Sequence, residues 1–357
     1  MGVLKWYIKQ IMLRDLELKN KKTIFNDKLK TMENTQFTNP ENSTFRKLLK
    51  FNGDHGQLIG LRIINNILTA ITLGIYYPWA RAAYLKYIYG ETEYLGTRFV
   101  FHGTGKEMFI GFIKAVGVIV GLYVFAILCA LSKVAVLAIV GVLIFYIAIF
   151  ILIPIAIHGS NKYRLSRTSW RGIHFGYRGD LKEFIKLYIV QVLLTIITFG
   201  IYGSWMQVKV SKYIMQHTRF GNIEFNFVGE GANLFVIKLK GVFLMILTLG
   251  IYSFWYYKEL LAFEVDNTKV MQNGKEINIR STMSAVQIFG LIFTNYLIIV
   301  FTLGIGTGIA INRALRTMME NIEFDSEIDA NTLEQTEAEY KDASGDDLAG
   351  MLDISVI

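Results

Sequence analysis

The chain has 357 residues, of which 53% are hydrophobic and 18% are charged, so it is more apolar and less charged than an average soluble domain. Its net charge of +8 is unevenly spread, because residues 320–357 carry twelve Asp and Glu against one Lys, whereas the rest carries 36 Lys and Arg against 17 Asp and Glu. The chain has one cysteine, Cys129, which excludes an internal disulfide and a thiolate metal site. The basic charge is not gathered into a nucleic-acid-binding module, so we expect membrane lipids rather than nucleic acid as partners.

Residues 1–45 form a basic N-terminal tail and linker. Apolar residues alternate with Lys and Arg up to position 19, a pattern that fits a helix lying on a membrane surface and equally a solvated tail. An apolar core followed by a small-residue cleavage site is absent from this stretch, so we expect no removable signal peptide. Residues 33–44, rich in Asn and Thr, are interpreted as the linker.

Six apolar windows follow, each close to the roughly 20 residues that a helix needs to cross the hydrocarbon core. They lie near 58–78, 108–131, 134–157, 184–203, 234–255 and 286–309. Only Ser132 and Lys133 separate the second window from the third, which predicts a tight helical hairpin. We therefore predict a mainly α, polytopic membrane protein with about six transmembrane helices in a domain over 46–325, followed by an acidic tail over 326–357.

A short motif recurs at the end of four windows. Thr-[Leu/Phe]-Gly-Ile begins at Thr72, Thr198, Thr248 and Thr302, and three copies reach a Trp seven residues later. The distance from Gly53 to Gly103 is fifty residues, as it is from Gly179 to Gly229. A fixed period of this size indicates duplication of one supersecondary unit. The glycine of each motif is interpreted as a left-handed helix cap, or alternatively as a helix break within the membrane.

The loops between windows contain alternating aromatic segments that end in Gly, such as Phe99-Val100-Phe101-His102-Gly103. Period-two alternation of this kind predicts short β-strands. We expect strand pieces near 51, 99–101, 173–177, 223–227, 277–280 and 322–324. Six single crossings place these pieces on two sides of the membrane with both tails in the cytoplasm, which is the arrangement we favour. Re-entrant single windows are the alternative, and they would let every strand join one sheet.

The first repeat resembles a known family. Its residues match two patterns that are typical of the YjgN-like family of bacterial inner-membrane proteins. One is an Asn-x-Leu-Leu-Thr-x-x-Thr-Leu-Gly-Ile-Tyr-x-Pro-Trp span, and the other is a Lys/Arg-Tyr … Gly-x-Arg-Phe-x-Phe-x-Gly exit. The matching positions include Asn66, Leu68, Thr69, Thr72, Gly74, Pro78, Trp79, Lys86, Tyr87, Gly96, Arg98 and Phe101. The entry differs, since Gly53 and Gly56 are one residue further apart than in the family pattern. The resemblance covers about 50–325 and implies a multi-pass protein of the bacterial inner membrane. The family is a domain of unknown function, so the resemblance carries over no catalytic residue.

Polar residues inside the windows form the candidate site. In two windows, spacings of i, i+4 and i+7 place an Asn or Gln and two threonines on one helix face. A third window has an Asn at the same distance before its Thr-Leu-Gly-Ile motif. We call this set the polar seam: Asn65, Thr69, Thr72, Gln191, Thr195, Thr198 and Asn295. The seam could line a solute path, or its amides and hydroxyls could tie helices together. A second set of aromatic and basic residues is expected at the lipid–water boundary and its headgroups: Trp79, Lys86, Trp205, Lys212 and Trp255.

These patterns suggest two functions. A small-solute or ion translocator would use the polar seam as its path, and a non-transporting membrane scaffold or lipid-binding protein would use the aromatic and basic loops. We find no catalytic constellation, metal-ligand spacing or cofactor motif, so we expect neither an enzyme nor a cofactor. Self-association into a homo-oligomer is left open by the sequence.

Overall fold

The computed structural model describes residues 45–337, and these contain ten short β-strands and ten α-helices. The basic N-terminal tail up to residue 44 and residues 338–357 of the acidic tail lie outside the described residues. The predicted surface helix and linker therefore fall outside them as well.

All ten strands belong to one antiparallel sheet in which sequence neighbours are spatial neighbours. At the two ends of this order, Arg46 and Phe324 exchange two backbone hydrogen bonds of 2.8 and 2.9 Å, which bring the sheet close to a closed barrel. The strands are β1 (Leu49–Phe51), β2 (Thr92–Tyr94), β3 (Thr97–Phe101), β4 (Thr168–Trp170), β5 (Ile173–Tyr177), β6 (Thr218–Phe220), β7 (Ile223–Phe227), β8 (Thr268–Gln272), β9 (Lys275–Ser281) and β10 (Ile322–Phe324).

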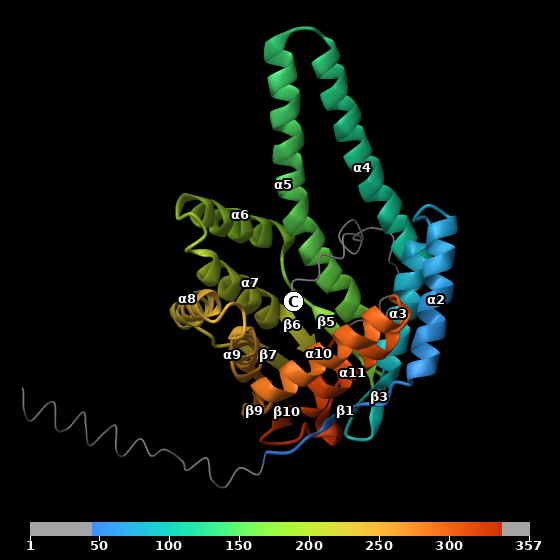
Figure 1. Cartoon of the computed structure of the whole chain (residues 1–357), viewed down its shortest axis with the longest axis vertical. Coiled ribbons are helices and arrows are strands. Elements are labelled where there is room, and N and C mark those ends of the chain that lie inside the picture. The colour runs from blue at the N-terminus through green and yellow to red at the C-terminus, as the bar shows by residue number, and fades with distance from the viewer. Residues whose placement is uncertain (1–44, 338–357) are drawn as a thin grey trace, which may run out of the picture. The chain divides into compact units, whose positions relative to one another are not determined.

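The helices form five hairpins, each inserted between two paired strands (Figure 1). They are α2 (His55–Ile71) with α3 (Tyr77–Glu91), α4 (Gly105–Leu131) with α5 (Ala135–Ser166), α6 (Leu181–Ile197) with α7 (Gly203–His217), α8 (Gly231–Leu247) with α9 (Ser253–Asp266), and α10 (Ala285–Phe301) with α11 (Thr307–Glu320).

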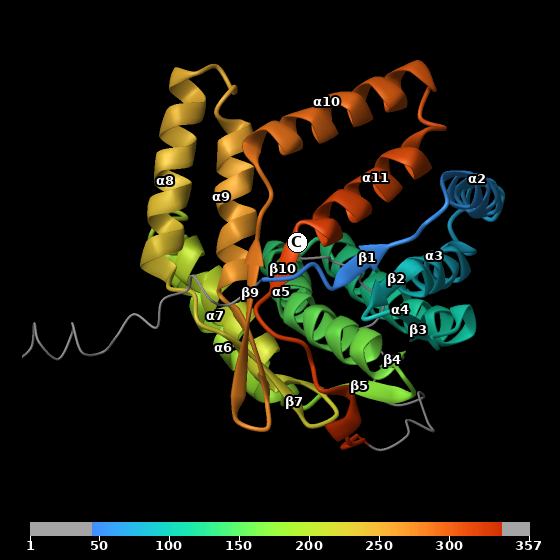
Figure 2. The same ribbon diagram turned by 90° about the horizontal axis from the view of Figure 1, so that it is seen from below.

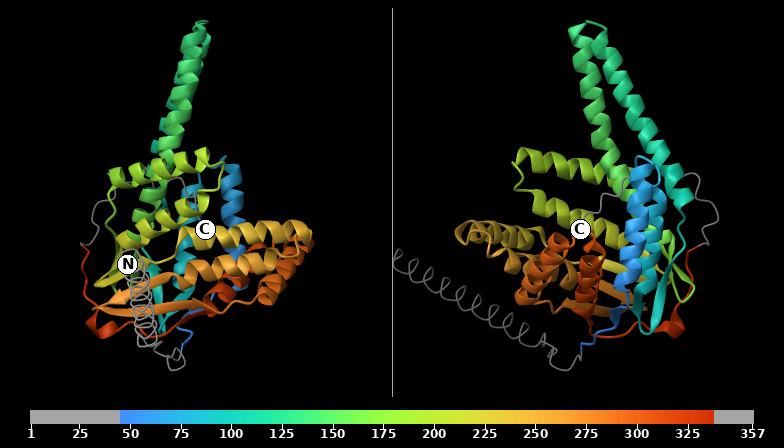
Figure 3. Two further views of the ribbon diagram at one scale, coloured as in Figure 1. Left: turned by 90° about the vertical axis from the view of Figure 1, so that its left-hand side faces the viewer. Right: turned by 45° about the vertical axis from the view of Figure 1, so that its right-hand side comes forward.

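Helical connections and tight turns alternate along the sheet. Because the strands are antiparallel and consecutive, all five helical hairpins must leave the same rim, and the turns between β2 and β3, β4 and β5, β6 and β7, and β8 and β9 must lie at the opposite rim. Seen from below, the hairpins radiate from the sheet (Figure 2). The α4–α5 hairpin extends well beyond the other four (Figure 3).

The interior of the sheet is a packed apolar core. Side chains from seven of the strands are buried there together: Tyr94, Trp170, Phe220, Ile223, Val270, Ile277 and Phe324. Ile328 and Leu333, which flank the short 3₁₀ helix η2 (Ala330–Thr332), pack against the same core. Alternation along each strand supplies these residues, since every second side chain faces inward.

The predicted fold class is wrong. Instead of a helical bundle with six crossings and strand pieces scattered over its loops, the described residues form a ten-stranded sheet with five helical hairpins on one rim. Two helices among these residues are long and apolar enough to cross a bilayer, namely α4 with 27 residues and α5 with 32. These correspond to the predicted windows 108–131 and 134–157. The strands expected in the loops are present, but they all join one sheet.

The other four windows failed as single crossings because the chain reverses inside each of them. A window such as 58–78 contains most of α2, the Thr-Leu-Gly-Ile turn and the first residues of α3. The apolar residues of this window therefore belong to two antiparallel helices, not to one continuous helix. A helix of 17 residues, such as α2, spans about 26 Å at 1.5 Å per residue, whereas α4 spans about 40 Å.

Candidate functional site

The Thr-[Leu/Phe]-Gly-Ile motif is the turn of a helical hairpin. In the first copy the amide of Gly74 donates to the carbonyl of Thr69 at 2.7 Å and that of Leu73 to Ala70 at 3.1 Å, the two bonds of a Schellman cap. Gly74 has φ of 92° and Leu73 has φ of 51°. A left-handed cap is therefore present at the predicted motif, but its C′ residue is Leu73, one position before the predicted glycine. The left-handed conformation costs a leucine about 1–2 kcal/mol.

The threonine of the motif joins the two helices of the hairpin. The hydroxyl of Thr72 donates to the carbonyl of Leu68 at 2.7 Å and accepts from the amide of Tyr76, the N-cap of α3, at 3.0 Å. Thr198, Thr248 and Thr302 make the same pair of bonds in their hairpins. One hydroxyl thus caps the start of the second helix at each turn.

The tips of these hairpins are exposed and apolar. The left-handed residue that follows each threonine is almost fully exposed: Leu73 by 93%, Phe199 by 99%, Leu249 by 94% and Leu303 by 93%. Exposed isoleucines continue this surface down the first helix, for example Ile64 and Ile67 on α2. The two long helices are equally uncovered, since only 6% of the most apolar window of each is buried. Contiguous apolar surface of this kind marks an interaction with lipid or another apolar partner.

Charge is absent from the short tips. Among the described residues, Lys133 is the one Lys or Arg in a turn between two helices, and it lies in the turn of the long α4–α5 hairpin. The other Lys and Arg residues of this part of the chain lie in the sheet, in its connections, or on helices. Among those on helices, Arg81 and Lys258 come about one turn after a tip, and Lys209 bonds the hydroxyl of Tyr202 at 3.0 Å. The short turns themselves are therefore uncharged and apolar, and cations begin about one helical turn away from them.

The structure distributes the polar seam over three hairpins. Asn65, Thr69 and Thr72 lie on or at the end of α2, Gln191, Thr195 and Thr198 on or at the end of α6, and Asn295 on α10. Asn65 and Gln191 are buried, with 8% and 5% exposure.

The hydrogen bonds of the seam residues stay within one hairpin. Asn295 donates from Nδ2 to the carbonyl of Ala310 on α11 at 3.0 Å. Thr69 and Thr195 bond carbonyls of their own helices at 2.7 and 2.8 Å. The buried Oδ1 of Asn295 and Oε1 of Gln191 have no hydrogen-bond partner.

The residues expected at the lipid–water boundary occupy two kinds of position. Trp79, Trp205 and Trp255 each stack on the tyrosine three residues earlier, with ring centroids 5.8–6.1 Å apart. Trp79 and Trp205 also lie against the first residue of the next hairpin, because a Cβ added to Gly105 or Gly231 would approach their Cδ1 atoms to 2.4 Å. Lys86 and Lys212 are exposed near the other ends of α3 and α7.

A charged network that the sequence analysis missed links two adjacent hairpins. Lys238 on α8 donates to Oε1 of Gln207 on α7 at 2.7 Å, and the amide nitrogen of Gln207 donates to Oε1 of Glu264 on α9 at 2.7 Å. Burial lowers the pKa of Lys238 and raises the pKa of Glu264, although each charge opposes the shift of the other. The three residues lie far apart in the sequence, so spacing carried no signal for this network.

A second network that the sequence analysis missed joins the bases of α4 and α5. Arg167 donates from Nε and Nη2 to the two carboxylate oxygens of Glu107 at 3.3 and 3.1 Å, and the hydroxyl of Tyr163 adds a 3.1 Å bond. Glu107 also completes a capping box with Thr104 at the start of α4. This sequence pattern, Thr-x-x-Glu before an apolar run, could have identified the helix start but not the distant arginine.

Comparison with known proteins identifies relatives. A family model described as "Bacterial protein of unknown function (DUF898)" matches residues 46–227 and 260–351. The chain is 27% identical over 167 residues to the Inner membrane protein YjgN of Salmonella typhimurium, a match that covers 43% of this chain and 40% of the relative. It is 32% identical over 134 residues to the protein of that name in Escherichia coli (strain K12), covering 38% of this chain and 32% of the relative.

The match spans about two fifths of these relatives or less, and no solved structure matches the chain. The relatives are inner membrane proteins by name, and the long helices α4 and α5 leave their apolar surface uncovered. The chain is a membrane protein.

Proposed function

The chain belongs to the DUF898 family of bacterial proteins, and we propose that it organises lipid in the inner membrane by embedding its helical hairpins from one side. In this arrangement α4 and α5 cross the bilayer, and the four shorter hairpins enter it without crossing. The sheet lies at the membrane surface. The function is thus that of a lipid-binding membrane scaffold rather than of a translocator.

The near-complete exposure of Leu73, Phe199, Leu249 and Leu303 carries this proposal. Transfer of one such side chain from water into lipid is worth about 1.5–3 kcal/mol. The hairpin turns satisfy their own backbone groups through the Schellman bonds and the threonine hydroxyl, so they can enter hydrocarbon without leaving those amides unpaired. An apolar tip with a satisfied backbone is the form that a re-entrant segment requires.

The distribution of cations supports an orientation with the sheet in the cytoplasm. Lys and Arg are frequent on the sheet and at the bases of the hairpins, while Lys133 lies at the distal turn of α4–α5. Cytoplasmic segments of membrane proteins are enriched in Lys and Arg. The described ends of the chain, Phe45 and Glu337, belong to the sheet side in this arrangement.

The contacts of the polar seam favour a scaffold over a translocator. Asn295 and the seam threonines bond groups of their own hairpins. The interior of the sheet below the hairpins is filled by aromatic and aliphatic side chains. The bond from Asn295 joins α10 to α11, and it supports a structural role for that residue, whereas the bonds of Thr69 and Thr195 stay within one helix.

Labelling of single cysteines in proteoliposomes tests the arrangement. In a Cys129→Ser background, cysteines replace Leu73, Leu249, Lys133 and Asn273 one at a time, and a membrane-impermeant maleimide is applied from each side. We expect Asn273→Cys, in the β8–β9 turn, to react from one side and Lys133→Cys from the other. Leu73→Cys and Leu249→Cys should react from neither side. Rapid labelling of both tip cysteines would contradict the embedded hairpins.

Lipid organisation is tested separately by counting the lipids that co-purify with the intact protein in native mass spectrometry. Leu73→Ser together with Leu249→Ser should reduce the retained lipid, because the tips lose apolar surface. Asn273→Ser is the control, since it changes an exposed residue of the distant sheet turn. Equal lipid retention by all three proteins would count against the proposal.

A further inference from the structure

The C-terminal part of the described chain is bound along the sheet. After β10, Ile328 and Leu333 pack on the apolar core of the sheet. Gln272 of β8 accepts from the amide of Asp329 at 2.8 Å and donates to its carbonyl at 2.9 Å. The amide of Ile328 donates to the hydroxyl of Tyr94 at 3.2 Å. These contacts guide the chain across the sheet toward β5 and β6.

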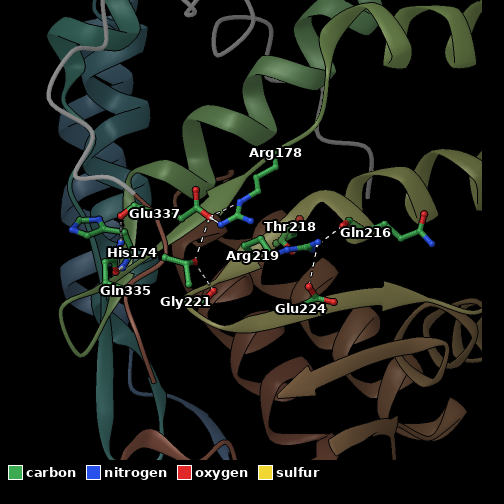
Figure 4. A network of polar contacts seen from close by, with 10 residues as sticks. His174, Arg178, Gln216, Thr218, Arg219, Gly221, Glu224, Gln335 and Glu337 are labelled. Carbon is green, nitrogen blue, oxygen red and sulfur yellow. Dashed lines mark hydrogen bonds and ion pairs between the residues drawn. The ribbon is translucent and has the colours of Figure 1, made fainter. Parts of the chain in front are cut away.

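Residues 334–337, which we call the latch, lie against β5 and the β6–β7 turn (Figure 4). The side chain of Gln335 accepts from the amide of His174 at 2.8 Å, and the hydroxyl of Thr336 donates to the carbonyl of Gly221 at 2.6 Å. At the end of the latch, Oε1 of Glu337 accepts from Nε and Nη2 of Arg178 at 2.9 and 2.7 Å.

Two glycines make room for the latch. A Cβ on Gly176 would lie 2.4 Å from Cδ of Glu337, and a Cβ on Gly221 would lie 2.4 Å from the backbone oxygen of Glu334. Gly176 is the next-to-last residue of β5, and the next-to-last residues of β3 and β7 are the larger Val100 and Asn226. The surface under the latch is therefore shaped to receive it.

The ion pair at the end of the latch is accessible. The side chain of Arg178 is 52% exposed and that of Glu337 is 20% exposed. Exposed pairs of this kind contribute about 0.2–1 kcal/mol, so another anion can compete for the arginine. Arg178 also lies two residues before Asp180, the N-cap of α6, and Lys182 in the first turn of α6 is exposed.

Arg178 thus stands where the sheet passes into an apolar hairpin, which is the headgroup level if the proposed membrane arrangement holds. We propose that Arg178 is a site for the phosphate of an anionic lipid and that Glu337 occupies it in place of that phosphate. A headgroup that binds Arg178 releases the latch. Because the sequence after Glu337 continues with Glu339, Asp342, Asp346 and Asp347, an anionic membrane surface would repel the released segment.

Hydrogen exchange of residues 328–337 in lipid nanodiscs tests this proposal. The full-length protein is placed in discs of phosphatidylcholine alone or of phosphatidylcholine with phosphatidylglycerol. We expect exchange to be about two- to fivefold faster with phosphatidylglycerol, the effect of losing one exposed ion pair. Glu337→Gln should exchange fast in both discs and retain more phosphatidylglycerol. Arg178→Gln should exchange fast in both discs without retaining more of it.

Arg280→Gln is the matched control, because Arg280 pairs with Glu323 at 2.9 Å and is 50% exposed but lies on β9. It should keep the wild-type response. The inference is overturned if phosphatidylglycerol leaves the exchange of the wild-type protein unchanged, if Arg178→Gln still responds to it, or if Arg280→Gln loses the response. A response to inorganic phosphate in discs of phosphatidylcholine alone would overturn the assignment to lipid.

The proposed function can fail separately, and labelling of Leu73→Cys in the same discs shows which of the two has failed. A protected tip cysteine with an unresponsive latch rejects the headgroup site alone. A reactive tip cysteine rejects the embedded hairpins, on which the headgroup site rests.

Discussion

Asn312 donates from Nδ2 to the carbonyl oxygen of Asp54 at 2.7 Å, although 258 positions separate the two residues. Asp54 caps α2, the first described α-helix, and Asn312 lies on α11, the last described α-helix. The hydroxyl of Tyr87 donates to the same carbonyl at 2.7 Å and also contacts Oδ1 of Asn312 at 3.3 Å. Through this group the fifth hairpin packs against the first, on the rim of a sheet whose ends also meet.

Replacement of Asn312 should weaken the fold. Its side chain is fully buried. Asn312→Leu removes the hydrogen bond to the carbonyl of Asp54 and also the one between Asn312 and the hydroxyl of Tyr87. We expect a loss of about 1–3 kcal/mol in the free energy of unfolding. Thermal unfolding in detergent measures the change, and Asn331→Leu, at an exposed residue of η2, serves as control. An unchanged midpoint for Asn312→Leu would show that this bond does not join the hairpins.

Thr72→Val should loosen the tip of the first hairpin. Valine has the size of threonine but cannot accept the hydrogen bond from Tyr76, so the start of α3 loses its cap. We expect a cost of about 1 kcal/mol, measured as faster hydrogen exchange at residues 73–77. Thr69→Val is the matched control, because the hydroxyl of Thr69 bonds only a carbonyl of its own helix. Equal effects of the two substitutions would refute the capping role.

Glycines on the same helix should differ in their tolerance of alanine. A Cβ on Gly105 would collide with the ring and backbone of Trp79, whereas a Cβ on Gly121 has open space. We expect Gly105→Ala to lower the free energy of unfolding by about 1–3 kcal/mol. Gly121→Ala should leave it unchanged or raise it by up to about 1 kcal/mol, because alanine favours the helix. The opposite order in a detergent unfolding experiment would falsify the packing described here.

The carboxyl group of Glu264 should make stability depend on pH. Burial raises its pKa, so the folded state holds the proton more tightly than the unfolded state. Its favourable contribution is fully present below the unfolded value near 4.5 and is lost as the pH rises through the folded value. The stability of wild type minus that of Glu264→Gln should therefore increase as the pH is lowered from 7 toward 4.5. Paired denaturation curves measure it, and a constant difference would contradict the shift.

Several local features could be predicted from sequence because their causes are local. Period-two alternation with terminal glycines located strands such as β3, β5 and β7. The Thr-Leu-Gly-Ile motif indicated a left-handed helix end, and the structure has one. The role of the polar seam stays a prediction, and its residues belong to three separate hairpins.

The number of membrane crossings could not be read from apolar length. A window such as 234–255 has the composition and length of one crossing, yet the chain reverses after Thr248 and the window spans two helices. Hydrophobicity reports how many residues prefer lipid but not the direction in which they run. The charged network of Gln207, Lys238 and Glu264 was equally hidden, because its members come from three helices.

From the order of residues alone it follows that long apolar stretches favour lipid and that short strands alternate with them. These properties follow from side-chain chemistry and from backbone preferences over a few residues. Tertiary structure alone decided that the strands form one sheet, that the hairpins leave a single rim and that Arg178 meets Glu337. Such relationships depend on pairing between segments up to hundreds of residues apart, and no local preference encodes which distant strand or side chain a segment will meet.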